Sequence, residues 1–208
     1  MRKVKMPLLD LLQKGGLAVY VLLFLSVISW AIVIERLLNL RPSIFLSRSF
    51  KDLKTLLAGG DTEGAIKLLS LDSSVASRIL LRILEDYRTG RISKEDLMRA
   101  LQEELDLVMP KLEKNIPLLS AIASLAPLVG LFGTITGLIK VFSAFSIEQG
   151  EQALRLLSSG IGEALVSAAV GLAVAIPALF FYWVFRILAG NILDRLEEEL
   201  SQVLRVIP

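Results

Sequence analysis

The sequence predicts an all-α integral membrane protein with three transmembrane helices, a helical insert between the first and second of them, and helices that extend from the membrane into the aqueous phase. Hydrophobic residues make up 54% of the 208-residue chain, whereas a soluble domain is about 45–50% apolar even with glycine counted. Three stretches, 15–34, 116–139 and 164–185, contain no charged residue. The insert over 35–115 holds 27 of the 44 charged side chains.

The residue types that are missing exclude several kinds of chemistry. The chain has no Cys and no His, so it offers no thiol nucleophile, no His-based catalytic triad and no His-ligated metal site. Its formal net charge is only +2, which gives no support for nucleic-acid binding. We therefore expect a protein that is not an enzyme, that needs no cofactor or metal, and that binds no nucleic acid.

The first 34 residues predict a surface segment followed by a membrane helix. Apolar and charged residues alternate over 1–14, which favours a short amphipathic helix on the membrane surface; a frayed terminus is the alternative. The uncharged run over 15–34 is long enough to cross a hydrocarbon core of about 30 Å. A signal peptide also begins this way, but its apolar run is only about 7–15 residues long and ends in a small-x-small cleavage site. This run ends at Glu35 without such a site, so we expect the helix to be retained.

The insert over 35–115 has helical periodicity and clear turn signals. The predicted helical segments are 43–57, 61–71, 73–88 and 93–112. Ser93-Lys94-Glu95-Asp96 fits a capping box that opens the last segment. Pro110 lies inside that segment and predicts a bend.

Two further membrane helices follow the insert. The second is predicted over 116–145 and the third over 160–189, with a short loop over 146–159 between them. An amphipathic pattern continues over 190–208, so the third helix should run on into the aqueous phase.

Small residues and prolines recur along these two late helices and predict close packing and bends. Gly133 and Gly137 form a GxxxG pattern, and such small-residue faces let membrane helices approach closely. The glycines at which we expect helix packing are Gly130, Gly133, Gly137 and Gly171. Pro127 and Pro177 each free a carbonyl one turn earlier, which predicts a bend or a bound water.

Polar residues in the apolar segments are candidates for function. Glu163 lies at the apolar boundary of the third helix, where a carboxylate is costly and is usually retained for a use. Ser159 and Ser167 share its helical face, which could line a polar path. Thr134 on the second helix is a weaker candidate, because a Thr hydroxyl can bond its own backbone one turn back.

Charge alone does not fix which side of the membrane the insert occupies. Eleven Lys and Arg residues lie near the membrane ends on the insert side and six on the other side. The windows differ in length, so the two densities nearly match. The positive-inside rule leans towards a cytoplasmic insert without deciding it.

Two long motifs carry a family resemblance. Residues 126–137 read Ala-Pro-Leu-Val-Gly-Leu-Phe-Gly-Thr-Ile-Thr-Gly, and residues 160–165 read Gly-Ile-Gly-Glu-Ala-Leu. Gly171 and Ala-Ile-Pro-Ala at 175–178 follow. In this order, after one early helix and a long helical insert, the motifs resemble the MotA/TolQ/ExbB proton channel family, specifically its ExbB/TolQ branch. The resemblance covers nearly the whole chain.

The resemblance implies a homopentamer in the bacterial inner membrane, with helices two and three of each copy lining a central pore. It implies a periplasmic N-terminus and loop, and a cytoplasmic insert and C-terminal helix. Inside the pore it implies a dimer of a single-span ExbD/TolR-like partner whose membrane Asp carries the proton, with a TonB- or TolA-like protein as a further partner. By the match, Thr134 is the pore-lining hydroxyl and Glu163 the glutamate near the pore mouth.

One position departs from the family pattern. The family usually has a second hydroxyl five residues after the glutamate, where this chain has Ala168, and the nearest hydroxyl is one residue earlier at Ser167. One residue rotates a side chain by about 100° on a helix. Ala168 occupies the family's pore position, and Ser167 faces either the pore or a neighbouring helix.

Three classes of function remain. The leading one is a pore-forming subunit of a proton-driven motor complex, which couples proton flow to mechanical work by the partner and so energises outer-membrane transport or envelope maintenance. The alternative is a passive membrane scaffold or small-solute transporter subunit, in which Glu163 merely caps a helix. A membrane enzyme is third, because the apolar segments hold no cluster of acids, bases or nucleophiles. Protons are favoured over sodium, which needs several oxygen ligands.

Overall fold

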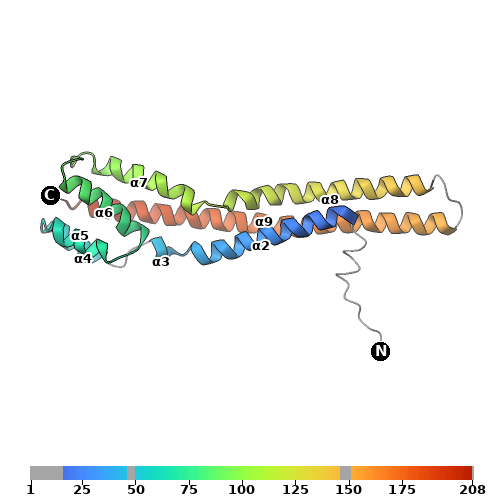
Figure 1. Ribbon diagram of the computed structural model, residues 1–208, viewed down its shortest axis with the longest axis horizontal. Coiled ribbons are helices and arrows are strands. Elements are labelled where there is room, and N and C mark those ends of the chain that lie inside the picture. Colours follow the sequence, from blue (N-terminus) through green and yellow to red (C-terminus); the bar gives the residue numbers. More distant parts are fainter. Residues whose placement is uncertain (1–15, 46–49, 146–150, 208) are drawn as a thin grey trace, which may run out of the picture. The chain divides into compact units, whose positions relative to one another are not determined.

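A computed structural model describes residues 16–45, 50–145 and 151–207, and these residues divide into two compact units (Figure 1). The first unit contains residues 16–34 and 115–183, and the second contains residues 35–114 and 184–207. All regular elements within the described ranges are helices. The predicted amphipathic segment over 1–14 lies outside the described residues.

Most of the residues of the first unit lie in three long helices, two of which continue into the second unit. The three helices are α2 (Gly16–Asn39), α8 (Ile116–Phe145) and α9 (Glu151–Leu204). Each is long and apolar enough to cross a membrane, as the three uncharged stretches predict. Figure 1 shows α8 and the first half of α9 side by side, with α2 along them. Many of their large apolar side chains stay exposed on the unit, because lipid rather than water is the solvent that such faces fit.

Small residues set how closely α8 and α9 approach. A Cβ atom on Gly130 would lie 2.9 Å from the backbone oxygen of Ser167, and one on Gly171 would lie 2.7 Å from the backbone oxygen of Ala126. Neither glycine could carry a side chain without moving backbone. Leu22 of α2 packs against this contact, buried together with Ala126 and Ala175. The glycines predicted to pack helices therefore lie where α8 meets α9.

The third membrane helix differs in length from the prediction. Residues 151–159, predicted as loop, form the first turns of α9, and residues 146–150 lie outside the described part. The reason is local: the segment contains Ala, Leu, Gln, Glu and Arg, which favour helix, and no Pro or Gly to stop it. At its other end α9 continues unbroken to Leu204, as the amphipathic pattern indicates.

The prolines of the membrane helices lie inside continuous elements. Pro127 lies within α8 and Pro177 within α9. The bends predicted at these positions stay predictions, as does the bend at Pro110, which lies within the last turn of α7 (Leu97–Leu112).

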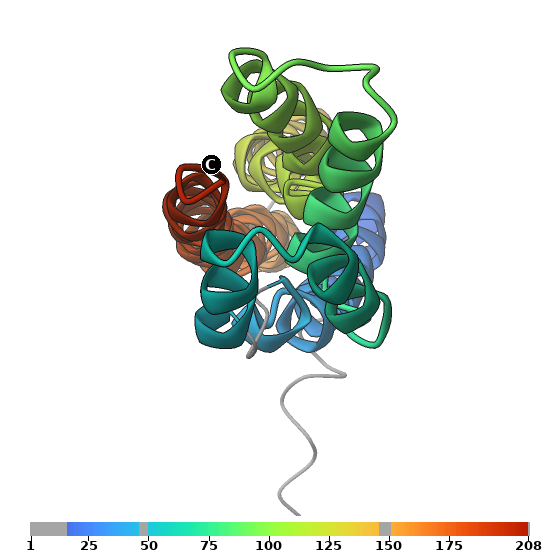
Figure 2. The same ribbon diagram turned by 90° about the vertical axis from the view of Figure 1, so that its left-hand side faces the viewer.

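Short amphipathic helices make up most of the second unit. Besides α7, they are α3 (Pro42–Phe45), α4 (Phe50–Ala58), α5 (Thr62–Ser70) and α6 (Val75–Arg88). Figure 2 shows them, from cyan to green, gathered together with the C-terminal end of α9 in red. Asp61 caps α5 by accepting a hydrogen bond from the Gly64 backbone N–H at 2.8 Å. Ser74 caps α6 in the same way through the Ser77 N–H at 3.2 Å.

The capping box predicted over 93–96 does not form. The hydroxyl of Ser93 donates to the Asp96 carboxylate at 2.8 Å, and Asp96 itself holds the cap position without a side-chain cap bond. The two side chains bond each other because α7 begins only at Leu97, so Ser93 lies outside the helix it was expected to cap.

Arg36 ties the end of α2 to the end of α7. Its guanidinium is buried, with 4% of the side chain exposed, and donates to the backbone oxygens of Lys111 and Leu112 at 3.5 and 3.3 Å. It also pairs with the neighbouring Glu35 carboxylate at 2.6 Å. Because buried backbone oxygens need donors, this side chain fixes where α7 ends against α2.

Candidate functional site

Glu163 forms an ion pair that links the two late membrane helices. The ammonium group of Lys140 on α8 lies 3.1 Å from Oε1 of Glu163 on α9. The Glu163 side chain is 25% exposed and that of Lys140 is 65% exposed. Glu163 is the one carboxylate within 16–34, 116–143 and 155–183, and Lys140 is the one cation within the second of these ranges. Each of these two charges therefore has the other as a partner.

The pair forms because small residues bring the backbones together beside it. A Cβ atom on Gly137 would lie 3.3 Å from both the Cβ and the backbone nitrogen of Ala164. Gly160 faces Val141 so closely that a Cβ there would collide with its Cγ2. These contacts flank Lys140 and Glu163 in sequence, and they hold the two charged side chains within reach.

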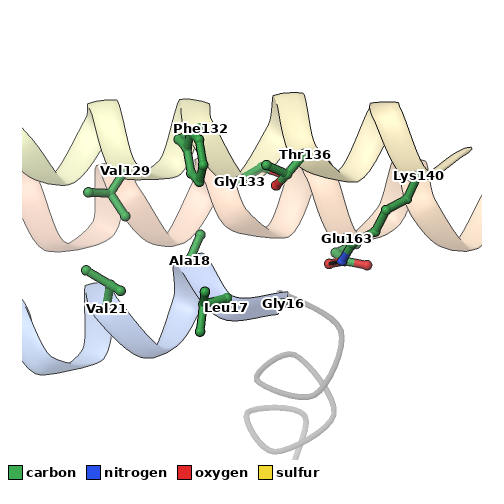
Figure 3. Close-up of a pocket in the computed structure, with 10 residues that line it drawn as sticks. All are labelled: Gly16, Leu17, Ala18, Val21, Val129, Phe132, Gly133, Thr136, Lys140 and Glu163. Carbon is green, nitrogen blue, oxygen red and sulfur yellow. Dashed lines mark hydrogen bonds and ion pairs between the residues drawn. The ribbon is translucent and has the colours of Figure 1, made fainter. Parts of the chain in front are cut away.

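A pocket of about 460 Å³ opens beside the ion pair, between α2, α8 and α9 (Figure 3). Glu163 and Lys140 line one end of it, and Thr136 and Gly133 line its α8 wall. The remaining lining is apolar and comes from α2 and α8. These lining residues are Leu17, Ala18, Val21, Val129 and Phe132. The pocket is an apolar groove with one paired carboxylate at its end.

Gly16 closes the pocket at the start of α2. Its φ is +62°, a left-handed conformation that favours glycine. A Cβ atom on Gly16 would collide with Oε1 of Glu163. The backbone of α2 thus begins directly against the carboxylate, and a side chain at this position would be strained by the positive φ and would displace the Glu163 carboxylate.

The two threonines of α8 direct their hydroxyls to their own helix. Thr134 donates to the Leu131 oxygen at 2.6 Å, and Thr136 donates to the Gly133 oxygen at 3.0 Å. The Thr134 bond is the hydrogen bond to the backbone of its own helix that the sequence indicates as the alternative to a functional role. Thr136 lines the pocket with Glu163, whereas Thr134 is half-buried and does not.

Ser167 is buried where α9 meets α8. Its side chain is fully buried, and a Cβ atom on Gly133 would collide with its hydroxyl oxygen. That hydroxyl has no hydrogen-bond partner among the described residues. Ser167 therefore packs against Gly133 of the neighbouring helix α8. Ala168 is half-buried, and its Cα lies 3.3 Å from where a Gly130 Cβ would be.

The sequence named Glu163 but not its partners. The sequence could have indicated Lys140 as a partner of Glu163, because Lys140 is the one charged residue of a helix that must neighbour the helix of Glu163. No local pattern indicates that Gly16 and Thr136 lie near Glu163, because their proximity depends on how three helices are rotated relative to one another. Within the described ranges, no group of three or more acidic side chains is arranged to hold a metal ion.

Comparison with known proteins gives consistent matches over most of the chain. The profile of the MotA/TolQ/ExbB proton channel family matches residues 72–198. The Tol-Pal system protein TolQ of Haemophilus influenzae is 31% identical, over 84% of this chain and 82% of that protein. The biopolymer transport protein ExbB of Neisseria meningitidis serogroup A is 27% identical, over 80% of each chain. The biopolymer transport protein exbB1 of Vibrio cholerae is 26% identical, over 93% of this chain and 86% of that protein.

Proposed function

Because the chain belongs to the MotA/TolQ/ExbB proton channel family, we propose that it is the pore-forming subunit of a proton-driven motor complex in the bacterial inner membrane. In this proposal five copies form a ring around a dimer of a single-span ExbD/TolR-like partner. Proton flow then drives mechanical work by that partner, which energises outer-membrane transport or envelope maintenance through a TonB- or TolA-like protein.

The observation that carries the proposal is the position of Glu163. It is the single carboxylate within 16–34, 116–143 and 155–183, and it lines a pocket. A carboxylate at the centre of a membrane helix costs about 2.5–3.5 kcal/mol on insertion scales, and one at the apolar boundary still carries part of this cost. A nearby ammonium group lowers this cost, and the pocket gives the carboxylate space in which water or a partner group can exchange a proton with it.

We propose separate roles for the two residues on which the family motifs fall. Glu163 holds or passes a proton near the periplasmic mouth, and Thr134 lines the pore formed between copies. Thr134 is half-buried within one protomer, so part of its side chain is available to a pore. The partner supplies the second carboxylate of the path, and the insert over 35–115 lies in the cytoplasm.

The Lys140 ion pair favours one competing function. If Glu163 only holds α8 against α9, the chain is a passive scaffold and the pair is its structural clasp. In that case loss of either partner of the pair has the same consequence. In the proposed proton path, loss of the carboxylate is far more damaging than loss of the ammonium group, because the proposal assigns the proton transfer to the carboxylate.

The test compares Glu163→Gln with Lys140→Gln. Each complex is purified with its single-span partner, its subunit ratio is measured by native mass spectrometry, and proton uptake into proteoliposomes is followed with a pH-sensitive dye under an imposed potential. We expect five copies with two partner chains in both variants. We expect proton uptake to fall at least about tenfold in Glu163→Gln and to stay within about threefold of wild type in Lys140→Gln.

Thr134→Ala is the second arm, with Ser124→Ala as its matched control on the same helix, because Ser124 does not line the pocket. Both variants remove a hydroxyl that bonds its own helix, so both should fold alike. Reduced proton uptake in Thr134→Ala alone supports a pore-lining hydroxyl. Equal losses of proton uptake in Glu163→Gln and Lys140→Gln would instead favour the passive scaffold. A purified complex that lacks the single-span partner would favour it too.

A further inference from the structure

The second unit carries a cationic cleft that the proton path does not use. It lies between α6 and α7, has a volume of about 250 Å³, and is bordered by three cations and one carboxylate. The charged residues are Arg78, Arg82, Lys111 and Glu104. Val75, Ile79, Leu107 and Val108 give the cleft an apolar floor.

Two of the cations have no partner in the described part of the chain. Arg82 donates to both oxygens of Glu104, at 2.7 and 3.0 Å, and these hydrogen bonds raise the pKa of Arg82. The only carboxylate of the cleft is thereby occupied. No hydrogen bond or ion pair joins the side chains of Arg78 or Lys111 to another described residue. The cleft therefore offers two free positive charges above an apolar floor.

Chain connections place one of these cations near the membrane surface. Lys111 precedes Ile116, the first residue of the α8 span, by five residues. Its backbone oxygen also accepts a hydrogen bond from Arg36, which lies two residues, or about 3 Å along the helix, beyond the uncharged stretch of α2. Headgroups occupy a layer of roughly 5–8 Å on each side of the hydrocarbon core. Lys111 is thus five residues from the start of one span in sequence, and it is bonded to a residue two positions beyond the uncharged stretch of another.

We propose that this cleft binds the headgroup of an anionic phospholipid. Arg78 and Lys111 contact the phosphate, and the first carbons of an acyl chain lie over Ile79 and Leu107. Charge selects the ligand, because the cleft has a net charge of +2 and its carboxylate is already paired. The short sequence separation of Lys111 from the α8 span favours lipid as its source, because anionic headgroups lie next to the ends of membrane spans. Leu107 is 58% exposed, which leaves apolar area for the chain to cover.

The binding test uses the full-length protein in detergent, titrated with phosphatidylglycerol or phosphatidylcholine and examined by native mass spectrometry. We expect tighter retention of phosphatidylglycerol by the wild type, and at least about fivefold weaker retention by the Arg78→Gln/Lys111→Gln variant. The matched control is Arg88→Gln/Lys94→Gln, which removes two exposed cations of the same unit outside the cleft. It should retain the lipid like the wild type.

Three results would overturn the proposal. Unchanged retention in the cleft variant would exclude the site, and equal loss in the control would show a general effect of charge. Loss of the oligomer without loss of lipid would show that an acidic segment of a second copy fills the cleft.

A second experiment, with a fluorescent label in the cleft, tests the proposal if the cleft variant fails to fold. The chain has no Cys, so Leu107→Cys provides a single site for a fluorophore in an otherwise wild-type cleft. We expect phosphatidylglycerol brominated on its acyl chains to quench this label more than brominated phosphatidylcholine does. A label at Met98→Cys, on α7 but outside the cleft, should not distinguish the two lipids. Equal quenching by both lipids at Leu107→Cys would contradict the proposal.

Discussion

Lys140 on α8 and Glu163 on α9 form a salt bridge of 3.1 Å beside the pocket that α2 closes. Within 116–143 and 155–183 the charged residues are Lys140, Arg155 and Glu163, and the bridge joins the lysine of α8 to the carboxylate of α9. It explains how a carboxylate is tolerated here. It also means that each variant of Glu163 changes a structural contact as well as any proton path, so stability and transport have to be measured separately.

The ion pair should contribute modestly to stability. We expect Lys140→Gln to lower the free energy of unfolding by no more than about 1 kcal/mol, because the Lys140 side chain is 65% exposed and solvent screens the attraction. Lys140→Glu should cost more, since it places two carboxylates together. Thermal unfolding in detergent measures both effects. The double variant Lys140→Glu/Glu163→Lys should regain most of the loss, and a double variant less stable than either single variant would contradict the pairing.

Gly16 should tolerate no side chain. Gly16→Ala should lower stability by at least about 1–2 kcal/mol, because its φ of +62° is strained for alanine and the new Cβ would collide with Glu163. Gly162→Ala is the matched control, since a Cβ there meets nothing within 4 Å. Alanine at this helical position should raise stability by about 0.5–1 kcal/mol. Similar melting temperatures for the two variants would refute this account of Gly16.

Ser167 should act through packing and not through its hydroxyl. Ser167→Ala removes a buried group without a described partner, so we expect stability to stay equal or to rise, with proton uptake unchanged. Gly133→Ala should cost about 1–3 kcal/mol by overpacking. Adding Ser167→Gly to Gly133→Ala should restore part of this loss, but not all of it, because Ala18 also lies close to the new Cβ. Reduced proton uptake by a stable Ser167→Ala protein would point to a path through this hydroxyl.

Arg36 should be the most sensitive cation of the second unit. Arg36→Ala removes the donor of the Lys111 and Leu112 oxygens, so we expect a loss of about 1–3 kcal/mol in chemical denaturation. Arg41→Ala is the control, because Arg41 is an exposed residue of the same type nearby and should change stability by less than about 0.5 kcal/mol. Equal losses would mean that the Arg36 bonds contribute little.

The helices of this protein follow from local sequence. Long uncharged runs define the spans, and Gly-containing turns at 59–60 and 89–90 divide the insert near where α4 and α6 end. The start of α9 does not follow from the local pattern. Residues 151–159 include polar side chains that suggest a loop, yet most of them are helix-forming types. The sequence also predicts that the glycines of α8 and α9 pack these helices closely, because small residues in a membrane helix have few uses other than close packing.

The sequence by itself determined that Glu163 is a costly and isolated carboxylate in a three-span membrane protein, because charge and length are properties of single segments. Only the tertiary structure decided what surrounds it. Lys140 and Gly16 reach Glu163, and Ser167 is buried against Gly133, because α2, α8 and α9 meet at one particular rotation. One residue of register turns a helix by about 100°, and no local pattern records the register between helices that are distant in the chain.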